Sequence, residues 1–218
     1  MTAAFDAVLT GRGTRLVRDD GVVLTWDPVR WRAGADPDDG WVLDRCTGPT
    51  VDLGCGPGRL VAALTARGVV ALGVDTSAAA RVLCRGRGAP MVRRDVFARL
   101  PGEGSWAHVL LADGNIGIGG DPARLLTRAA GLLRPGGSVI VETGPDPDEW
   151  WRGTARTCDD GDPPRLRHPH RRPGSAAVEV AWACVGAAAL RRPAAASGLR
   201  VVAASPPGGR SFVELQRG

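Results

Sequence analysis

At 218 residues, with 44% hydrophobic and 23% charged residues, the chain has the size and composition of one soluble globular domain. All 28 basic residues are arginines spread along the sequence, so the formal net charge of +5 favours a solvated surface over a nucleic-acid-binding face. Five cysteines without a CxxC pair argue against a disulfide framework, and the absence of a signal peptide or long apolar span predicts a cytoplasmic protein without a membrane partner.

The N-terminal 48 residues are predicted to form a small cap on the rest of the chain. An Asp-Asp-Gly turn inside 14–26 indicates a hairpin, and a short helix is expected to follow it. Behind this cap, short apolar runs bounded by turn residues alternate with helical segments, which indicates a parallel sheet covered on both faces. The expected strands are 49–54, 69–75, 89–95, 107–113 and 138–143, and the expected helices are 58–67, 77–86 and 121–133.

The C-terminal third of the sequence changes character. Residues 144–175 are rich in Pro, Gly, Arg and Asp and are predicted to be an insertion or lid loop. A helical pattern over 181–198 precedes two short apolar runs, 199–205 and 210–217, which are joined by a Pro-Pro-Gly-Gly turn and predict an antiparallel hairpin. The expected organisation is therefore a single domain with a cap (1–48), a cofactor-binding core (49–143), the insertion (144–175), and a C-terminal helix and hairpin (176–218).

A glycine loop follows the first core strand in the stretch VDLGCGPGRL, residues 51–60. Glycines at 54, 56 and 58 allow a tight turn from strand to helix and a close approach of a ligand to the backbone. The spacing is G-x-G-x-G and lacks the features of dinucleotide-binding or P-loop motifs. Asp52, just before the loop, would repel a phosphate and attract a cation. This arrangement favours S-adenosylmethionine, a nucleoside that carries an ammonium and a sulfonium group.

Two further acids end the next two core strands. Asp75 closes the second strand, where a carboxylate can accept hydrogen bonds from both ribose hydroxyls. Asp95 closes the third strand, where it can accept from an adenine amino group while Val96 and Phe97 pack against the base. A strand-end aspartate is more often a turn or capping residue, but three of them at one edge of a sheet indicate a ligand site.

These segments, with LLRPGGSVIVE further on, resemble the class I S-adenosylmethionine-dependent methyltransferases over residues 49–143. The resemblance implies an α/β fold with a doubly wound, mostly parallel seven-stranded sheet and an antiparallel C-terminal hairpin. It also implies S-adenosyl-L-methionine as the cofactor and no resident metal. The cofactor contacts that it implies are Asp52, Gly54, Cys55, Gly56 and Gly58 for the methionine end, Asp75 for the ribose, and Asp95 with Val96 for the adenine. Thr76 and Ala112 are further expected cofactor contacts.

The segment 110–122 is expected to face the transferable methyl group. Asp113 and Asn115 are the predicted catalytic residues, positioned to orient an acceptor, while Gly117 and Gly119 are expected to leave room for it. The alternative that Asp113 and Asn115 only stabilise turns stays open. The segment does not match the Asn/Asp-Pro-Pro-aromatic motif of amino-methylating relatives, so methylation of nucleic-acid bases is not favoured.

Other candidate residues carry weaker signals. His168 and His170 lie near several acids, but their spacing fits no familiar zinc pattern. The arginines of the insertion could grip an anionic substrate or remain solvated. An aromatic-walled acceptor pocket is a further possibility, with ordinary packing as the alternative. The tryptophans concerned are Trp26, Trp31, Trp150, Trp151 and Trp182.

The sequence thus predicts methyl transfer from S-adenosylmethionine to a small-molecule acceptor, with no nucleic-acid partner. Two alternatives stay open: an RNA or protein methyltransferase that uses the Arg-rich insertion, and a non-catalytic protein that binds S-adenosylmethionine. Neither the methylated atom nor the oligomeric state can be predicted.

Overall fold

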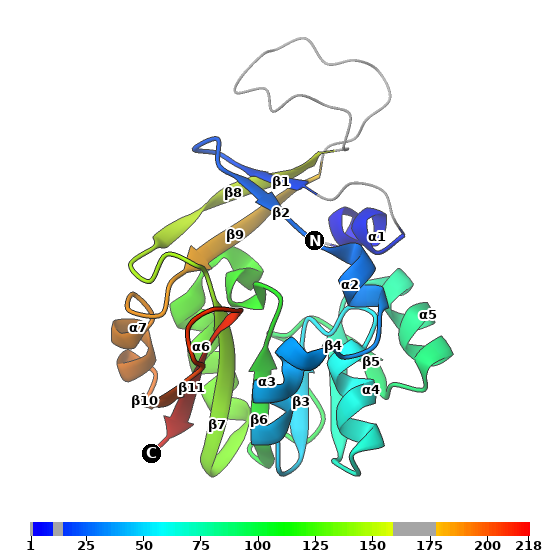
Figure 1. The fold of residues 1–218 in the computed structure, drawn as a ribbon, viewed down its shortest axis with the longest axis vertical. Helices are drawn as coiled ribbons and strands as arrows, with labels where there is room; N and C mark the ends of the chain where they lie inside the picture. Colours follow the sequence, from blue (N-terminus) through cyan, green and yellow to red (C-terminus); the bar gives the residue numbers. More distant parts are fainter. Residues whose placement is uncertain (1, 11–14, 159–177) are drawn as a thin grey trace.

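The computed structural model describes residues 2–10, 15–158 and 178–218, which form two β-sheets with helices packed around them (Figure 1). Five neighbouring strands of the larger sheet are parallel, and its last strand in sequence runs antiparallel to both of its neighbours. The predicted seven-stranded, mostly parallel sheet with an antiparallel C-terminal hairpin is confirmed. In spatial order its strands are β10 (Leu199–Ala204), β11 (Ser211–Arg217), β7 (Leu133–Thr143), β6 (Trp106–Leu111), β3 (Thr50–Leu53), β4 (Ala71–Asp75) and β5 (Met91–Arg93).

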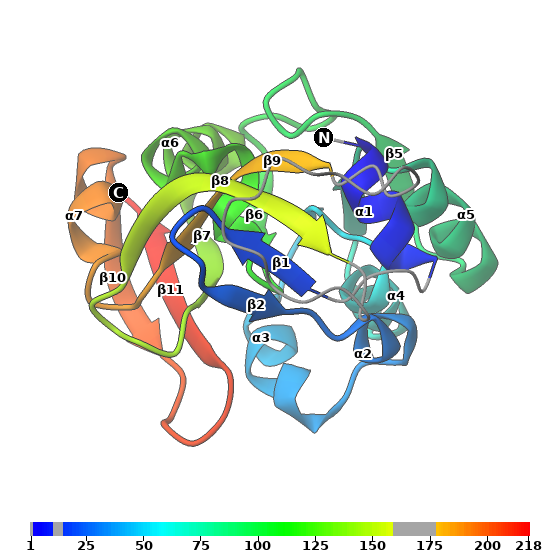
Figure 2. The ribbon, with the colours of Figure 1, turned by 90° about the horizontal axis from the view of Figure 1, so that it is seen from above.

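Helices cover both faces of the larger sheet, as expected for a sheet whose strands are apolar on both sides. One core cluster packs α3 (Gly40–Arg45), α4 (Arg59–Ala66) and α5 (Ala78–Arg87) on one face. The other cluster packs α6 (Pro122–Leu132) and α7 (Arg191–Ala196) on the opposite face, as seen from above in Figure 2.

Local sequence signals account for the boundaries of the core helices. The Ser77 side chain caps α5 by accepting from the Ala80 N–H at 2.9 Å. Asp121 caps α6 by accepting from the Arg124 N–H at 3.1 Å, with Pro122 at the first helical position. The three predicted core helices and five predicted core strands are all present, with shifts of one or a few residues at their ends.

A second, four-stranded sheet lies across the carboxyl edge of the parallel strands (Figures 1 and 2). Its β9 strand packs against the 3₁₀ segment η2 (Asn115–Gly120), which follows β6. The smaller sheet therefore covers the edge at which open α/β sheets bind their ligands. Its strands, in order, are β2 (Val23–Thr25), β1 (Arg15–Arg18), β8 (Trp150–Cys158) and β9 (Glu179–Val185).

Two sequence-based expectations are wrong in this second sheet. Residues 150–158, predicted as loop, form β8, which pairs with β1 on one side and β9 on the other. Residues 181–185, predicted as the start of a helix, belong to β9. Val180 and Trp182 are buried while Glu179 and Ala181 are exposed, and this alternation at the start of β9, together with pairing to β8, outweighs the helix propensity of the alanines. The rest of the predicted insertion, 159–177, lies outside the described residues.

The N-terminal cap contains the predicted hairpin, β1 and β2, and the predicted short helix, α2 (Pro28–Arg32). It also contains helix α1 (Thr2–Leu9), which the sequence analysis missed, and the 3₁₀ turn η1 (Pro37–Asp39). Within the part of the chain that the structure describes, no helix combines the length and apolarity needed to cross a bilayer.

Candidate active site

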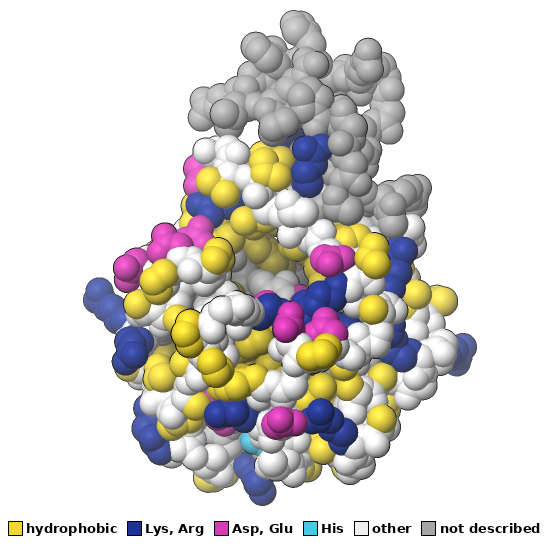
Figure 3. Space-filling view, in the orientation of Figure 1, with side chains coloured by type: hydrophobic (Ala, Val, Ile, Leu, Met, Phe, Trp, Pro, Cys, Tyr) yellow, Lys and Arg dark blue, Asp and Glu magenta, His cyan; other side chains and the backbone are white. Residues whose placement is uncertain are grey.

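A pocket lies between the carboxyl edge of the parallel strands and the smaller sheet, and it opens as a hollow in Figure 3. It contains about 940 Å³ of empty space, a volume that includes the open solvent at its mouth. The structure brings all but one of the predicted site residues together in its lining. The exception, Gly58, lies behind the loop as the left-handed cap of α4. The predicted residues that line the pocket are Asp52, Gly54, Cys55, Gly56, Asp75, Thr76, Asp95, Val96, Ala112, Asp113 and Asn115.

The backbone N–H groups of the glycine loop, residues 54–58, all donate hydrogen bonds to other atoms of the protein. Gly54 and Cys55 both donate to the Val74 carbonyl, at 2.8 and 3.1 Å. Gly56 donates to the Asp75 carboxylate at 3.0 Å, and Gly58 donates to the Cys55 carbonyl at 2.9 Å. The remaining loop residue, Pro57, has no backbone N–H. No loop amide is left to cradle a phosphate, in contrast to the loops that bind pyrophosphate.

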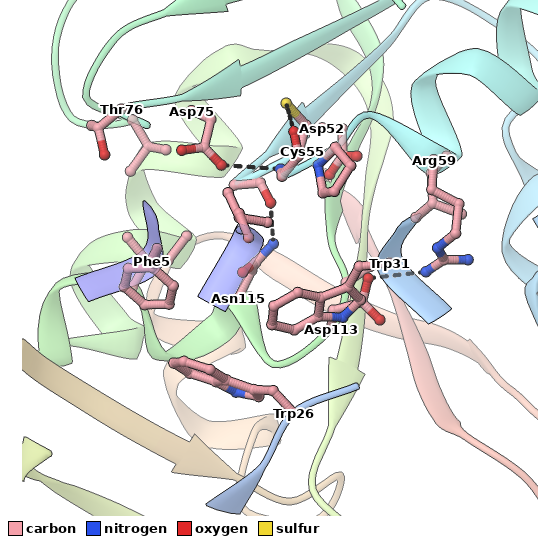
Figure 4. A pocket seen from close by; sticks show the side chains of 18 of the residues that line it. Phe5, Trp26, Trp31, Asp52, Cys55, Arg59, Asp75, Thr76, Asp113 and Asn115 are labelled. Carbon is pink, nitrogen blue, oxygen red and sulfur yellow. Dashed lines mark hydrogen bonds and ion pairs between the residues drawn. The ribbon is translucent and has the colours of Figure 1, made fainter. Parts of the chain in front are cut away.

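Asp75 holds the loop and also faces the pocket (Figure 4). Its second carboxylate oxygen accepts from the Ser77 N–H at 2.8 Å, and each oxygen keeps a further lone pair for a ligand. Burial raises the pKa of Asp75, although bonds from the Ser77 and Gly56 amides oppose that shift. Asp95, at the end of β5, is exposed at the pocket rim and accepts from the Phe97 N–H at 2.8 Å.

Asp52 is the most unusual acid of the pocket. Its side chain is only 3% exposed, and the described residues supply no hydrogen bond to its carboxylate. Burial, reinforced by the nearby charge of Asp113, raises its pKa to about 7. Burying a carboxylate without a hydrogen-bond partner costs free energy, and a positively charged ligand group beside Asp52 would offset that cost.

Two buried thiols pack behind the loop. The Cys84 thiol donates to the Gly56 carbonyl at 3.2 Å, and the Cys55 thiol lies against Gly73, where any side chain would clash with it. A hydrogen bond with Cys84, together with burial, raises the pKa of the Cys55 thiol. Cys55 is therefore a protonated packing residue whose backbone shapes the loop.

Asn115, in the segment after β6, is hydrogen-bonded to the glycine loop through its side chain. Its amide group donates to the carbonyl oxygens of Leu53 and Gly54, at 3.0 and 2.9 Å. A β-carbon at position 54 would lie 2.7 Å from that amide nitrogen, which explains why a glycine is needed there. Asn115 thus ties the acceptor-side segment to the first glycine of the loop.

Asp113 lies in the left-handed region with φ of 54°, which is unusual for a residue other than glycine. Its carboxylate contacts three guanidinium groups, those of Arg30 at 3.1 Å, Arg59 at 2.9 Å and Arg210 at 2.8 Å. Its backbone N–H donates to the Glu142 carboxylate. The strained backbone is therefore held by charged contacts from four distant parts of the chain.

Asp39 lies at the centre of the same network and is fully buried. It contacts Arg30 at 3.1 Å, Arg210 at 2.8 Å, and also Arg59, which is 3% exposed. We call Arg30, Asp36, Asp39, Arg59, Asp113, Glu142 and Arg210 the charged network. Apart from Asp113, the sequence analysis missed its members, because single charges scattered over 180 residues carry no local signal that they meet.

Four aromatic rings form the opposite wall of the pocket. The ring of Phe5 lies 5.1 Å from that of Trp26 and 5.5 Å from that of Trp182, and Trp26 lies 5.7 Å from Trp31. We call these four rings the aromatic wall. The expected aromatic lining is thus present at three of the five tryptophans, whereas Trp151 stacks under Arg18 and Trp150 lies outside the pocket.

The two glycines expected to leave room for an acceptor serve a different purpose. A β-carbon at Gly117 would collide with the Ala183 carbonyl and lie 2.6 Å from the Trp182 ring. At Gly119 it would lie 2.9 Å from the Phe97 ring. That expectation is wrong, because these glycines let β9 and an aromatic side chain approach the segment.

The candidate metal ligands His168 and His170, with their neighbouring acids, lie outside the described residues. Within 2–10, 15–158 and 178–218, no group of three or more His, Cys, Asp or Glu side chains has an arrangement suited to a metal ion.

Comparison with known proteins places this pocket in a methyltransferase fold. A family model described as a methyltransferase domain matches residues 50–137. A trans-aconitate 2-methyltransferase from Paracidovorax citrulli is 35% identical over 96 residues, which cover 42% of this chain and 37% of that protein. The match therefore spans little more than a third of this relative's length.

Solved structures extend the likeness to nearly the whole chain. A methyltransferase from Bacteroides fragilis in complex with S-adenosyl-L-homocysteine superposes with a TM-score of 0.72 at 16% identity, over 98% of this chain and 92% of its own. CalS10 from Micromonospora echinaspora, an amino pentose methyltransferase with S-adenosylmethionine bound, gives 0.59 at 17% identity, over 87% and 94%. At these identities the likeness establishes the fold.

Proposed function

We propose that this chain, which belongs to the class I S-adenosylmethionine-dependent methyltransferases, transfers a methyl group from that cofactor to a small-molecule acceptor. The observation that carries the proposal is the pairing of the glycine loop: its amides are used within the protein, while the buried Asp52 beside it has no hydrogen-bond partner among the described residues. Such a site suits a nucleoside that carries cations and not one that carries phosphates.

The residues present fit S-adenosylmethionine along the whole edge. Asp52 and the loop would hold the methionine end through its ammonium group, and Asp75 with Thr76 would accept from the ribose hydroxyls. Asp95 and Val96 would enclose the adenine, and Ala112, next to Asp113 after β6, would lie at the end of the cofactor that carries the methyl group. When bound, the cofactor supplies an electrophilic methyl group on a sulfonium, so the chain itself needs to bind, orient and exclude water.

On the acceptor side, we assign the orienting role to Asp113. It lines the pocket, and three arginines fix its direction, so it can hold an acceptor group in one geometry. Asn115 acts as a positioning residue, because its amide nitrogen is bound to the loop carbonyls. The aromatic wall closes the pocket from the other side and excludes water from the reacting groups.

A small-molecule acceptor is supported by the confined space under the smaller sheet. The names of the similar proteins, a trans-aconitate methyltransferase and an amino pentose methyltransferase, agree with this class. The alternative of an RNA or protein acceptor depends on an Arg-rich segment that lies mostly outside the described residues, so the described part of the chain gives it no support.

Two measurements test the proposal. In calorimetric titrations, S-adenosylhomocysteine should bind and NAD should not; tight NAD binding would overturn the interpretation of the loop. Methyl transfer from radiolabelled S-adenosylmethionine should then be followed into the small-molecule, RNA and protein fractions of a cell extract. Label in the small-molecule fraction is the expected result. Label only in RNA or protein would contradict the acceptor class, and cofactor binding without any transfer would indicate a non-catalytic binding protein.

A further inference from the structure

The aromatic wall is assembled from three separate parts of the chain. Phe5 comes from α1, Trp26 and Trp31 come from the segment after β2, and Trp182 comes from β9. Trp182 is 3% exposed, whereas the other three rings are only partly buried and turn a free surface toward the pocket. In Figure 4, Trp31 lies beside Asp113, and Trp26 faces Asn115 from below. Partly bare rings around an enclosed space are suited to a flat or ring-shaped apolar ligand.

The charged residues of the pocket favour a positively charged ligand. Among the residues that the structure describes, four carboxylates line the pocket, and Arg59 is the single cation in that lining. That guanidinium contacts Asp39 and Asp113, and Asp113 itself contacts three guanidinium groups, so the charges of both Arg59 and Asp113 are shared within the charged network. Within the network itself, three arginines face four acids. An anionic acceptor would therefore enter a pocket with an excess of negative charge, whereas a cation would be attracted.

The aromatic wall and the carboxylates together recognise positive charge. A cation close to the face of a tryptophan ring is stabilised by the ring quadrupole, and the effect grows when water is excluded. Asp113 and Trp31 both line the pocket, and in Figure 4 both are drawn on the side away from Asp75 and Thr76. A single bound group can therefore contact a ring face and a carboxylate at once.

We propose, resting on the proposed function, that the acceptor is an amine carried on a ring-shaped apolar body. The body packs against Trp26 and Trp31, and the nitrogen lies near Asp113. In the transfer, the nitrogen lone pair forms the new N–C bond, the C–S bond of the sulfonium breaks, and its electron pair stays on sulfur. Because a protonated nitrogen has no free lone pair, the bound ammonium group first loses one proton to the solvent at the open mouth of the pocket, and the neutral amine then attacks. The alkylated amine remains a cation in the same aromatic surroundings after methyl transfer.

Three probes of similar shape and different charge test this inference. Benzylamine, benzyl alcohol and benzoate are titrated at pH 7 into the protein saturated with S-adenosylhomocysteine, with binding followed by ligand-detected NMR. Benzylamine is expected to bind about tenfold more tightly than the other two, because only it offers a cation to the rings and to Asp113. Benzyl alcohol binding equally well, or benzoate binding more tightly, would overturn the inference.

Matched variants locate the binding. Trp26→Leu should weaken benzylamine binding about tenfold and Trp26→Phe less, because phenylalanine keeps an aromatic face. Trp150→Leu removes a tryptophan that is 43% exposed and outside the pocket, and should leave the affinity unchanged. A loss in Trp150→Leu equal to that in Trp26→Leu would overturn the assignment to the aromatic wall.

The outcomes separate this inference from the function on which it rests. Undetectable benzylamine binding by a protein that still binds S-adenosylhomocysteine would overturn only the amine acceptor. Failure to bind S-adenosylhomocysteine at all would overturn the proposed function itself.

Discussion

The two sides of the pocket are built in different ways. The cofactor side comes from residues 52–57, 75–76 and 95–96, which lie at or just beyond the carboxyl ends of β3, β4 and β5. The acceptor side comes from the charged network and the aromatic wall, whose members range from Phe5 to Arg210. The cofactor side therefore depends on short local segments at the ends of single strands. The acceptor side forms only when distant parts of the chain have come together.

The difference also appears in the kind of interaction. On the cofactor side, backbone amides and a few carboxylates define the site, as in the bond from the Gly56 N–H to Asp75. On the acceptor side, side-chain ion pairs in a largely buried setting hold Asp113 in a strained backbone conformation. Breaking one partner of such a pair costs more than losing one surface contact, because an uncompensated charge stays buried.

The largest expected effect is at Asp39, the buried centre of the charged network. Asp39→Ala leaves three arginines without their shared carboxylate and should lower the free energy of unfolding by about 3–5 kcal/mol. Thermal and chemical denaturation measure it. Asp44→Ala is the control, because Asp44 is 72% exposed and its pair with Arg67 should contribute less than about 1 kcal/mol. Equal effects of the two substitutions would show that the network does not act as a buried unit.

Asp113→Asn tests the acceptor side for function. The substitution removes a charge but keeps the shape, so methyl transfer should fall about ten- to a thousandfold while S-adenosylhomocysteine affinity stays within about twofold. Single-turnover rates with a labelled acceptor and calorimetry give the two numbers, with Asp44→Asn as control. If the rate per folded molecule is preserved and only thermal stability is lost, Asp113 merely supports its turn.

Asp75→Ala tests the cofactor side. Loss of the ribose contact and of the bond to Gly56 should weaken S-adenosylhomocysteine binding about thirtyfold, or about 2 kcal/mol. Asp95→Ala, at the exposed rim, should weaken it less. Calorimetry on variants whose melting temperatures match that of the parent decides the comparison, and an unchanged affinity in Asp75→Ala would exclude Asp75 as a ligand contact.

Asp52 should make cofactor binding depend on pH. Because burial raises its pKa to about 7, the carboxyl group is neutral below that pH, and affinity for a cationic ligand should fall by up to about tenfold per pH unit. Asp52→Asn should bind more weakly at pH 8 and show a flat profile between pH 5 and 8. The measurement is calorimetry across that range in buffers of constant ionic strength.

The stability of the free protein gives an independent check on Asp52. A folded pKa above the unfolded value favours folding at low pH, and that contribution is lost as the pH rises from about 4 through about 7. Asp52→Asn lacks this loss, so its stability relative to the parent should be greater at pH 8 than at pH 4. An equal difference at both pH values would contradict the raised pKa.

The smallest expected effect separates Asn115 from Asp113, although only one residue lies between them. Asn115→Ala removes two hydrogen bonds to the glycine loop and should weaken S-adenosylhomocysteine binding about three- to tenfold. Asn115→Asp keeps the size but loses the donor, and should behave like the alanine variant. If cofactor affinity is unchanged in both, Asn115 does not position the loop.

The sequence predicts the larger sheet and the cofactor side well, for a physical reason. Buried parallel strands are short apolar runs, and their helices carry caps such as Ser77 and Asp121, so each element is defined by its own residues. The acids Asp75 and Asp95 end two of these strands and necessarily reach the same edge.

The smaller sheet and the charged network could not be predicted in the same way. Strand β9 contains two alanines and leads into the alanine run 187–189, so its local sequence resembles a helix, whereas its pairing with β8 makes it a strand. Asp39 and Arg210 are 171 positions apart, and each alone has the appearance of a solvated surface charge. Only the folded chain brings them within contact distance, so their role follows from tertiary structure.

The position of Arg210 has a consequence for how the protein is made. Strand β11, which begins at Ser211, lies between β7 and β10, so β10 leaves the ribosome before the strand that joins it to the sheet. The segments of the cofactor side lie between residues 52 and 96, whereas Asp113 and Asp39 wait for an arginine that is synthesised more than a hundred residues later. A nascent chain therefore carries every residue of its nucleoside site long before it can secure the group that orients an acceptor.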